Sequence, residues 1–156
     1  MARRRRSERR TLTPDPKFES ELVAKIINYV MECGKKSVAE RIVYGALDEI
    51  GSKMKQDPIE VLIRAIDNIK PRVEVRSRRV GGGTYQVPVD VGRDRQLALA
   101  LRWLMQFSSS RKGVPMAKAL AQELMDAFSN QGNAVRKKED THKMAQANKA
   151  FAHYAW

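Results

Sequence analysis

The stretch PRVEVRSRRVGGGTYQVPVDV, residues 71–91, decides the fold because its apolar period differs from that of the rest of the chain. Apolar residues alternate with polar ones in both halves, which is the spacing of a strand: they are Val73 and Val75, then Tyr85, Val87, Val89 and Val91. Gly81-Gly82-Gly83 between the halves supplies turn conformations. The stretch therefore predicts a β-hairpin, with Pro88 on an edge strand because proline cannot donate to a ladder. We expect its base to be packed by Val73, Val75, Val89 and Val91.

The rest of the chain spaces its apolar residues at steps of three and four, the period of a helix. Three such runs precede the hairpin and three follow it. In the third run the core-facing residues are expected to be Ile59, Leu62, Ile63, Ile66 and Ile69. The predicted fold is mainly α: a six-helix bundle with a projecting basic β-hairpin, at about residues 72–91, inserted between helices 3 and 4.

Residues with known capping preferences predict where these helices begin and end. Gly34 is expected to end the first helix as a left-handed cap, and Ser37-Val38-Ala39-Glu40 to begin the second as a capping box. Asp57-Pro58 begins the third helix, with proline at its first position. Pro71 stops that helix, Gly132 is expected to end the fifth, and Asn133 to cap the last.

Length and composition indicate one domain. The chain has 156 residues, of which 42% are hydrophobic, enough for a core. We expect a disordered basic N-terminal arm over residues 1–17, a single helical domain over 18–150 and an aromatic C-terminal tail over 151–156. No run is long and apolar enough for a membrane span, and no secretory signal is visible. A single cysteine, Cys33, excludes an internal disulfide, so we expect a cytoplasmic protein.

The net charge of +12 is confined to three short stretches. Residues 1–10 carry +5, residues 70–80 carry +4 and residues 136–149 carry +3, while the other 121 residues hold 14 basic and 14 acidic side chains. Solvated surfaces also carry basic runs, but this segregation is typical of a protein that binds a polyanion at several points. Aromatic residues, which can stack on bases or pack against a partner protein, accompany two of the stretches: Tyr85, Phe151, Tyr154 and Trp156. The predicted partner is a nucleic acid.

No enzymatic or metal-binding pattern is visible, so neither catalysis nor a cofactor is predicted. Gly34-Lys35-Lys36-Ser37 resembles the end of a phosphate-binding loop, but Tyr29 stands where that loop needs its first glycine. Its two lysines, beside a helix N-terminus, can still attract a backbone phosphate. Cys33, expected to be a buried helix end, and His142, expected to be solvated, have no metal-ligand spacing to His153.

Three long segments carry a resemblance to a known family. They are residues 34–47 (GKKSVAERIVYGAL), residues 82–89 (GGTYQVPV) and residues 137–154 (KKEDTHKMAQANKAFAHY). In them the chain closely resembles the bacterial small-subunit ribosomal proteins of the seventh family, and the match covers nearly its whole length.

The resemblance implies a ribosome-bound structural protein that binds the 3′ major domain of small-subunit ribosomal RNA and nucleates assembly of the head. It also implies that the protein lies near exit-site transfer RNA and messenger RNA and touches neighbouring proteins of head and platform. The expected ribosomal RNA contacts are Arg3, Arg4, Arg5, Arg6, Arg9, Arg10, Lys35, Lys36, Arg76, Arg78, Arg79, Arg111, Lys112, Arg136, Lys137 and Lys138. The residues expected near transfer or messenger RNA are Gly81, Gly82, Gly83, Thr84, Tyr85, Lys143 and Lys149.

The alternative from another class is an architectural DNA-binding protein that inserts a basic β-arm into the minor groove. Such arms usually carry an apolar wedge at the tip, and Gly81–Gly83 offers none. Binding to duplex DNA and to structured RNA at matched salt separates the two.

Overall fold

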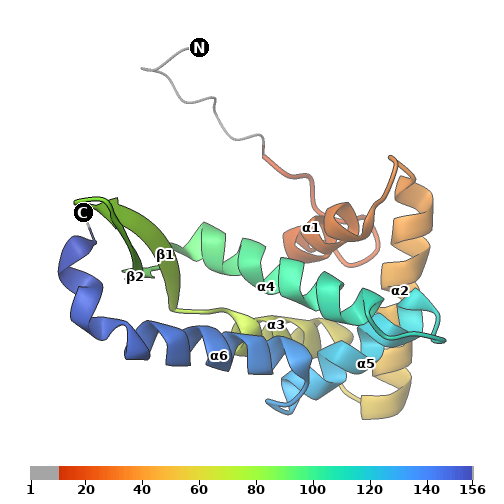
Figure 1. Ribbon diagram of the computed structural model, residues 1–156. Coiled ribbons are helices and arrows are strands. Elements are labelled where there is room, and N and C mark those ends of the chain that lie inside the picture. The colour runs from red at the N-terminus through yellow and green to blue at the C-terminus, as the bar shows by residue number, and fades with distance from the viewer. Residues whose placement is uncertain (1–10, 156) are drawn as a thin grey trace.

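The computed structural model describes residues 11–155, and these residues form a helical bundle from which one β-hairpin extends (Figure 1). The elements are α1 (Glu21–Val30), α2 (Lys36–Met54), α3 (Pro58–Ile69), β1 (Val73–Val80), β2 (Gly83–Asp90), α4 (Arg93–Ser109), α5 (Met116–Phe128), α6 (Asn133–Ala147) and the short 3₁₀ helix η1 (Lys149–Tyr154). The predicted class is confirmed: the described residues form six α-helices with the hairpin between the third and the fourth.

The core is organised around α5, which packs against α2, α3, α4 and α6. The small alanines on its buried face allow neighbouring helices to approach closely. The alanines and leucines of this face are Ala119, Leu120, Ala121, Leu124 and Ala127. Side chains of α1, α2, α3, α4 and α6 complete the core, and each fully buried Leu or Ile contributes about 1.5–3 kcal/mol of hydrophobic stabilisation. In α3 one expected core residue was assigned wrongly. Ile63 is 47% exposed, whereas Val61 and Ala65 are buried.

Two predicted helix boundaries near residue 34 were wrong. Helix α1 ends at Val30, because Met31 is already extended, and Gly34 lies in the following turn with a φ of +73°. Helix α2 begins at Lys36 after Lys35, and no side chain caps it, so Ser37 lies inside the helix and makes no capping box. Cys33 also has positive φ in this turn and is exposed, not buried as expected.

The start of α6 is capped by a residue distant in sequence, so the predictions that Gly132 ends α5 and that Asn133 caps α6 were wrong. Helix α5 ends at Phe128, and Gly132, with a φ of +91°, is the residue before α6 and not the end of α5. Asn133 is the first helical residue and caps nothing. Instead, the carboxylate of Glu123 accepts a hydrogen bond from the Ala134 N–H at 3.0 Å. The start predicted for α3 is confirmed: Asp57 accepts from the Ile59 N–H at 3.0 Å, and Pro58 occupies the first position.

The hairpin pairs its strands in a register that separates the valines. Val73 lies opposite Asp90 and Val75 opposite Pro88, so odd-numbered residues of β1 share a face with even-numbered residues of β2. Val73 and Val75 therefore face away from Val87, which is fully buried. Of the four valines expected to pack at the base, Val91 is buried in the core and the other three are half-buried. The register places Val73 and Val75 on the face opposite Val89, which alternation within one strand does not reveal. Pro88 does lie on an edge, since the sheet has two strands.

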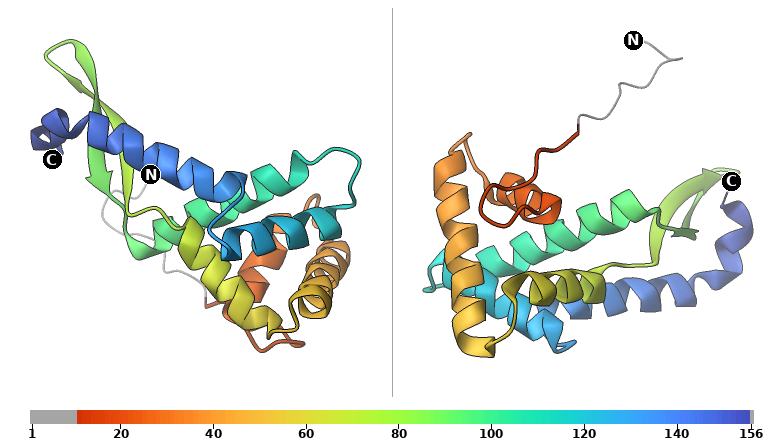
Figure 2. Two further views of the ribbon diagram at one scale, coloured as in Figure 1. Left: turned by 90° about the horizontal axis from the view of Figure 1, so that it is seen from below. Right: turned by 180° about the vertical axis from the view of Figure 1, so that it is seen from behind.

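Hairpin and C-terminal helix extend together from one end of the bundle (Figure 2). The strand β1 packs along α6, and β2 packs against η1. The opposite end of the bundle is formed by α2 and the turn between α4 and α5 (Figure 1).

Candidate nucleic-acid interface

Two of the three basic stretches lie side by side in the structure. Within residues 70–80 and 136–149, which hold 10 basic and 3 acidic residues, the strand β1 packs against α6. The Arg72 N–H donates to Nε2 of His142 at 3.0 Å, which joins the base of the hairpin to α6. Lys138 Nζ donates to the Asn68 carbonyl at 2.7 Å, at the end of α3. Residues 70 positions apart in sequence are thus in contact, and the two stretches form one basic end of the molecule.

His142 supports this contact as a neutral ring. Burial, and then the charges of Lys138 and Arg72, hold the pKa of His142 below its ordinary value of 6.5. A neutral imidazole can accept the Arg72 N–H through Nε2, whereas the protonated ring cannot. The prediction of a solvated His142 was therefore wrong: the residue is half-buried and holds the hairpin to α6.

The arginines of β1 differ in their ion pairing within the protein and in their exposure to solvent. Glu74 is only 7% exposed and binds both Arg76 and Arg95, with Arg95 Nε 2.8 Å from Oε1. Arg76 is therefore partly neutralised. Arg79 is exposed, and Arg78 is half-buried. The outer half of β1 carries the more accessible positive charge.

The hairpin tip is open, but Tyr85 behind it is covered. Gly81 and Gly82 have φ values of +57° and +88°, and no atom lies within 4 Å of the position that a Cβ would take at either residue. Thr84 is exposed. The ring of Tyr85 lies 5.3 Å from that of Phe151 and 5.4 Å from that of Tyr154 in η1. These three aromatic rings thus pack against one another at tilted angles and attach η1 to the hairpin. Trp156 lies outside the described residues. Lys143 and Lys149, at the end of α6 and the start of η1, are exposed.

Side chains from α2 and the α4–α5 turn form a second basic region at the other end of the bundle. Lys35 and Lys36 are exposed at the start of α2, and Lys36 makes a long 3.8 Å ion pair with Glu40. Lys112 is exposed in the turn between α4 and α5. Lys35 and Arg111 line one groove of about 590 Å³, so the structure brings these two regions together.

Arg111 is directed into the protein. Its Nη2 lies 2.5 Å from Glu123 Oε2 and 2.8 Å from Asp126 Oδ2, and Glu123 is fully buried. Hydrogen bonding to Glu123 raises the pKa of Arg111 above its ordinary value, so the guanidinium stays protonated. The guanidinium charge is thus balanced by two carboxylates, and Lys112 beside it is the more accessible cation.

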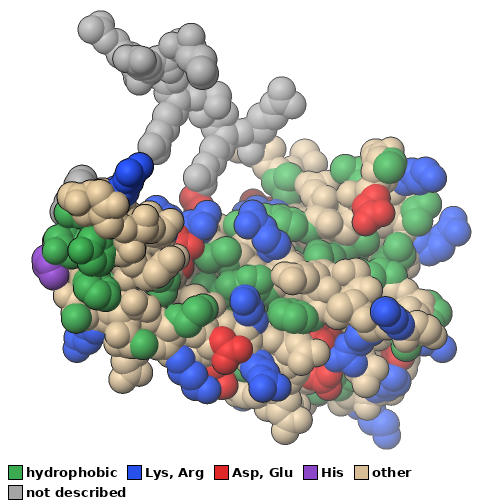
Figure 3. Space-filling view, in the orientation of Figure 1, with side chains coloured by type: hydrophobic (Ala, Val, Ile, Leu, Met, Phe, Trp, Pro, Cys, Tyr) green, Lys and Arg blue, Asp and Glu red, His purple; other side chains and the backbone are tan. Residues whose placement is uncertain are grey.

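On α6, Arg136 is exposed, Lys137 is half-buried and Lys138 is held by Asn68. Arg3, Arg4, Arg5, Arg6, Arg9 and Arg10 lie outside the described residues. Figure 3 shows Lys and Arg side chains along the lower edge of this face and around the end formed by α2.

Sequence reasoning missed three buried acids: Asp15, Glu74 and Glu123. Glu74 and Glu123 bind arginines, whereas Asp15 binds backbone groups and the Tyr44 hydroxyl. Only Asp15 has a local signal, because its carboxylate accepts from N–H groups two and three residues ahead, as in an Asx turn. Within residues 11–155, no cluster of three or more His, Cys, Asp or Glu residues could hold a metal ion. The same residues contain no helix long and apolar enough to cross a membrane.

Comparison with known proteins places the chain in a family. Residues 2–149 match the model of the family described as ribosomal protein S7p/S5e. Relatives named small ribosomal subunit protein uS7 include one from Anaeromyxobacter sp. (strain K), 60% identical over 156 residues with both chains covered in full. Another, from Thermotoga neapolitana, is 56% identical over 154 residues, which cover 99% of each chain. The chain therefore belongs to the ribosomal protein S7p/S5e family, which confirms the resemblance seen in its sequence and the expectation that it is not an enzyme.

Proposed function

We propose that this chain is a primary ribosomal RNA-binding protein of the small subunit, which binds the 3′ major domain and nucleates assembly of the head. Membership of a ribosomal protein family supports the part of the proposal that the protein acts within the ribosome. The observation that carries the proposal is the packing of β1 on α6, which joins two separate basic stretches into one basic end. In the cell the protein is ribosome-bound in the cytoplasm.

The structure favours a subset of the predicted RNA contacts. Exposed cations can reach phosphates at no cost in internal ion pairs, and they are Lys35, Arg79, Lys112 and Arg136. Lys36 is exposed and only weakly paired. Arg76, Arg111 and Lys138 have intramolecular partners and would position their neighbours more than bind RNA themselves. Arg78, Lys137 and the arginines of residues 3–10 complete the proposed set.

A second part of the proposal concerns the hairpin tip. Gly81–Gly83 and Thr84, with Lys143 and Lys149 nearby on α6 and η1, form the surface that would lie beside exit-site transfer RNA and the messenger path. An open glycine tip lets a nucleic-acid backbone approach closely, because no Cβ intervenes. Neighbouring proteins of head and platform would pack on other faces.

Equilibrium binding to the isolated 3′ major domain, with duplex DNA of equal length at matched salt, tests the proposal. We expect at least about a thousandfold preference for the RNA, the lower end of the usual range of specific over non-specific binding. Equal affinity for both would support the architectural DNA-binding alternative and refute the proposal. A charge-reduced variant, Lys35→Gln with Arg79→Gln, should lose affinity, whereas Lys53→Gln, an exposed lysine of α2 paired with Glu49, is the matched control.

A further inference from the structure

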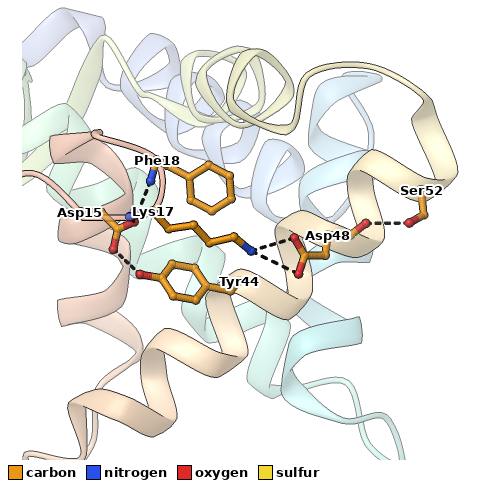
Figure 4. A network of polar contacts seen from close by, with 6 residues as sticks. All are labelled: Asp15, Lys17, Phe18, Tyr44, Asp48 and Ser52. Carbon is orange, nitrogen blue, oxygen red and sulfur yellow. Dashed lines mark hydrogen bonds and ion pairs between the residues drawn. The ribbon is translucent and has the colours of Figure 1, made fainter.

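Asp15 is the most extensively bonded residue of the segment that precedes α1. It is only 3% exposed, although it lies between two prolines in a stretch predicted to be disordered. Figure 4 shows its carboxylate between the backbone of its own turn and the side chain of Tyr44. The predicted boundary at residues 17 and 18 therefore cuts through an ordered contact.

Four hydrogen bonds of Asp15 are local and close a turn over residues 15–20. Its Oδ2 accepts from the N–H groups of Lys17 at 3.1 Å and Phe18 at 3.2 Å. Its carbonyl accepts from the Glu19 N–H at 2.7 Å, and its own N–H donates to the Ser20 carbonyl at 3.3 Å. Glu19 adopts a φ of +48°, a conformation that costs energy for a residue with a side chain. The surrounding contacts must therefore hold the turn in place.

The fifth hydrogen bond attaches this turn to α2. Tyr44 Oη donates to Asp15 Oδ1 at 2.7 Å, and that bond, followed by burial, raises the pKa of Tyr44 to about 12, so the donor stays protonated. Around it, the ring of Phe18 packs on Tyr44 with centroids 5.9 Å apart. Lys17 Nζ lies 3.1 Å from Asp48 and 5.0 Å from the Tyr44 ring centroid.

This attachment fixes the place where the N-terminal segment leaves the domain. Arg10 precedes Asp15 by five residues, a reach of at most about 17 Å of extended chain. If the turn came off α2, the tether would lengthen by the residues up to Glu21, where α1 begins. A longer flexible tether lowers the effective concentration of a binding segment and adds to the entropy lost on binding.

We propose that the hydrogen bond between Asp15 and Tyr44 is an anchor for the basic stretch of residues 1–10, and that the contribution of this stretch to RNA affinity depends on it. The proposal rests on the proposed function, in which that stretch binds ribosomal RNA. Asp15 and Tyr44 are positioning residues: they act on RNA only through the segment that they hold.

The first experiment measures the anchor without RNA. Cys33 is the chain's single cysteine and is exposed, so a spin label there and one at Thr11→Cys report the distance between segment and domain. We expect a narrow distribution in the otherwise wild-type protein and a clearly broader one with Tyr44→Phe, which removes only the hydroxyl. Ser52→Ala, on the same helix, removes a hydroxyl bonded to the Asp48 carbonyl and should change nothing. Equal widths for Tyr44→Phe and Ser52→Ala would overturn the proposal.

The second experiment is a double-mutant cycle in RNA affinity. Tyr44→Phe is combined with a full-length variant whose six arginines in residues 3–10 are replaced by glutamine. Loss of a hydrogen bond to a charged group shifts a local equilibrium about ten- to a hundredfold. We therefore expect Tyr44→Phe to weaken binding at least about threefold when the arginines are present, and less than about 1.5-fold when they are absent. Thermal melts establish that each variant is folded.

The outcomes separate the anchor from the proposed function. Equal losses in both backgrounds would overturn the anchor and leave RNA binding intact as a function. If the glutamine variant binds RNA as tightly as wild type, the arginines of residues 3–10 contribute nothing to RNA affinity. The anchor then has no effect on binding, and the proposal also fails. Failure of wild-type protein to bind the RNA refutes the proposed function, while the label distances still decide whether the anchor exists.

Discussion

Replacement of Glu123 by alanine should be among the most destabilising single changes in this protein. Glu123 is fully buried and does two things at once: Oε2 binds Arg111 at 2.5 Å and Oε1 accepts the Ala134 N–H at 3.0 Å. Removal of one partner of a buried ion pair costs about 3–5 kcal/mol, and an unsatisfied buried N–H costs about 1–3 kcal/mol. Asp126, 2.8 Å from Arg111, keeps part of the pairing, so we expect a net loss of about 3–4 kcal/mol.

Urea and thermal unfolding followed by circular dichroism measure this loss. For a chain of this length, 1 kcal/mol corresponds to about 2–4 °C, so the melting temperature should fall by roughly 6–16 °C. Asp126→Asn is the matched control, since it removes the half-buried partner of the same arginine, and it should cost about 1 kcal/mol. A Glu123→Ala variant that loses less than about 1 kcal/mol, or no more than Asp126→Asn, refutes the reasoning.

The same network decides what Arg111 does. If Arg111 acts inside the protein, Arg111→Met should destabilise the fold, and the double variant Arg111→Met with Glu123→Leu should recover part of the loss because no buried charge is left alone. The RNA affinity of the folded double variant should then lie within about threefold of wild type, a difference of less than about 0.7 kcal/mol. A loss of a hundredfold would show that Arg111 binds RNA directly.

Three further predictions follow from the basic end and the hairpin. If six to ten basic side chains meet phosphates, RNA affinity measured by filter binding should fall about 10³–10⁵-fold between 50 and 200 mM salt, and a nearly flat dependence would contradict phosphate-dominated binding. The folded state keeps the pKa of His142 below 6.5, so its stabilising contribution is present above that value and is lost as pH falls below it. The melting temperature should therefore drop between pH 7 and pH 5 more in wild type than in His142→Gln; equal drops would exclude this role. Shortening the hairpin from Arg78 to Gln86 should leave subunit assembly largely intact but alter exit-site transfer RNA retention or reading-frame accuracy, and failure to enter subunits would make the hairpin an assembly element.

The six α-helices and the hairpin were predictable because each depends on local periodicity, whereas the 3₁₀ helix η1 was not: its residues were expected to form the end of the domain and an aromatic tail. The helical runs and the change to period 2 at residues 71–91 are properties of neighbouring residues, and so is the Asp57-Pro58 helix start. The missed boundaries have a different origin. Glu123 caps α6 from 11 residues away, and no local pattern around Asn133 could show that an acid from α5 already fills the position.

The hairpin shows the same limit. Alternation in each strand predicts which residues share a face of that strand, but the pairing between strands is set by the turn and by packing. The observed register places Glu74 on the face of Val87, where burial forces it to take cationic partners, Arg76 and Arg95. Arg95 is 21 residues from Glu74, so a count of charges in a sequence window cannot include it.

The distinction between a basic stretch and a basic contact follows from these buried acids. The net charge of each stretch is a sum that intramolecular pairing does not change, so the long-range field that attracts a polyanion is correctly given by the sequence. A residue that binds phosphate must also be free of a competing partner within the protein. Arg76, Arg111 and Lys138 do have such intramolecular partners. Substitution of such a residue should change stability first and affinity second, whereas substitution of Arg79 or Lys112 should change affinity alone. Binding and unfolding measured on the same variants therefore sort the predicted contacts into those that touch RNA and those that hold the surface in shape.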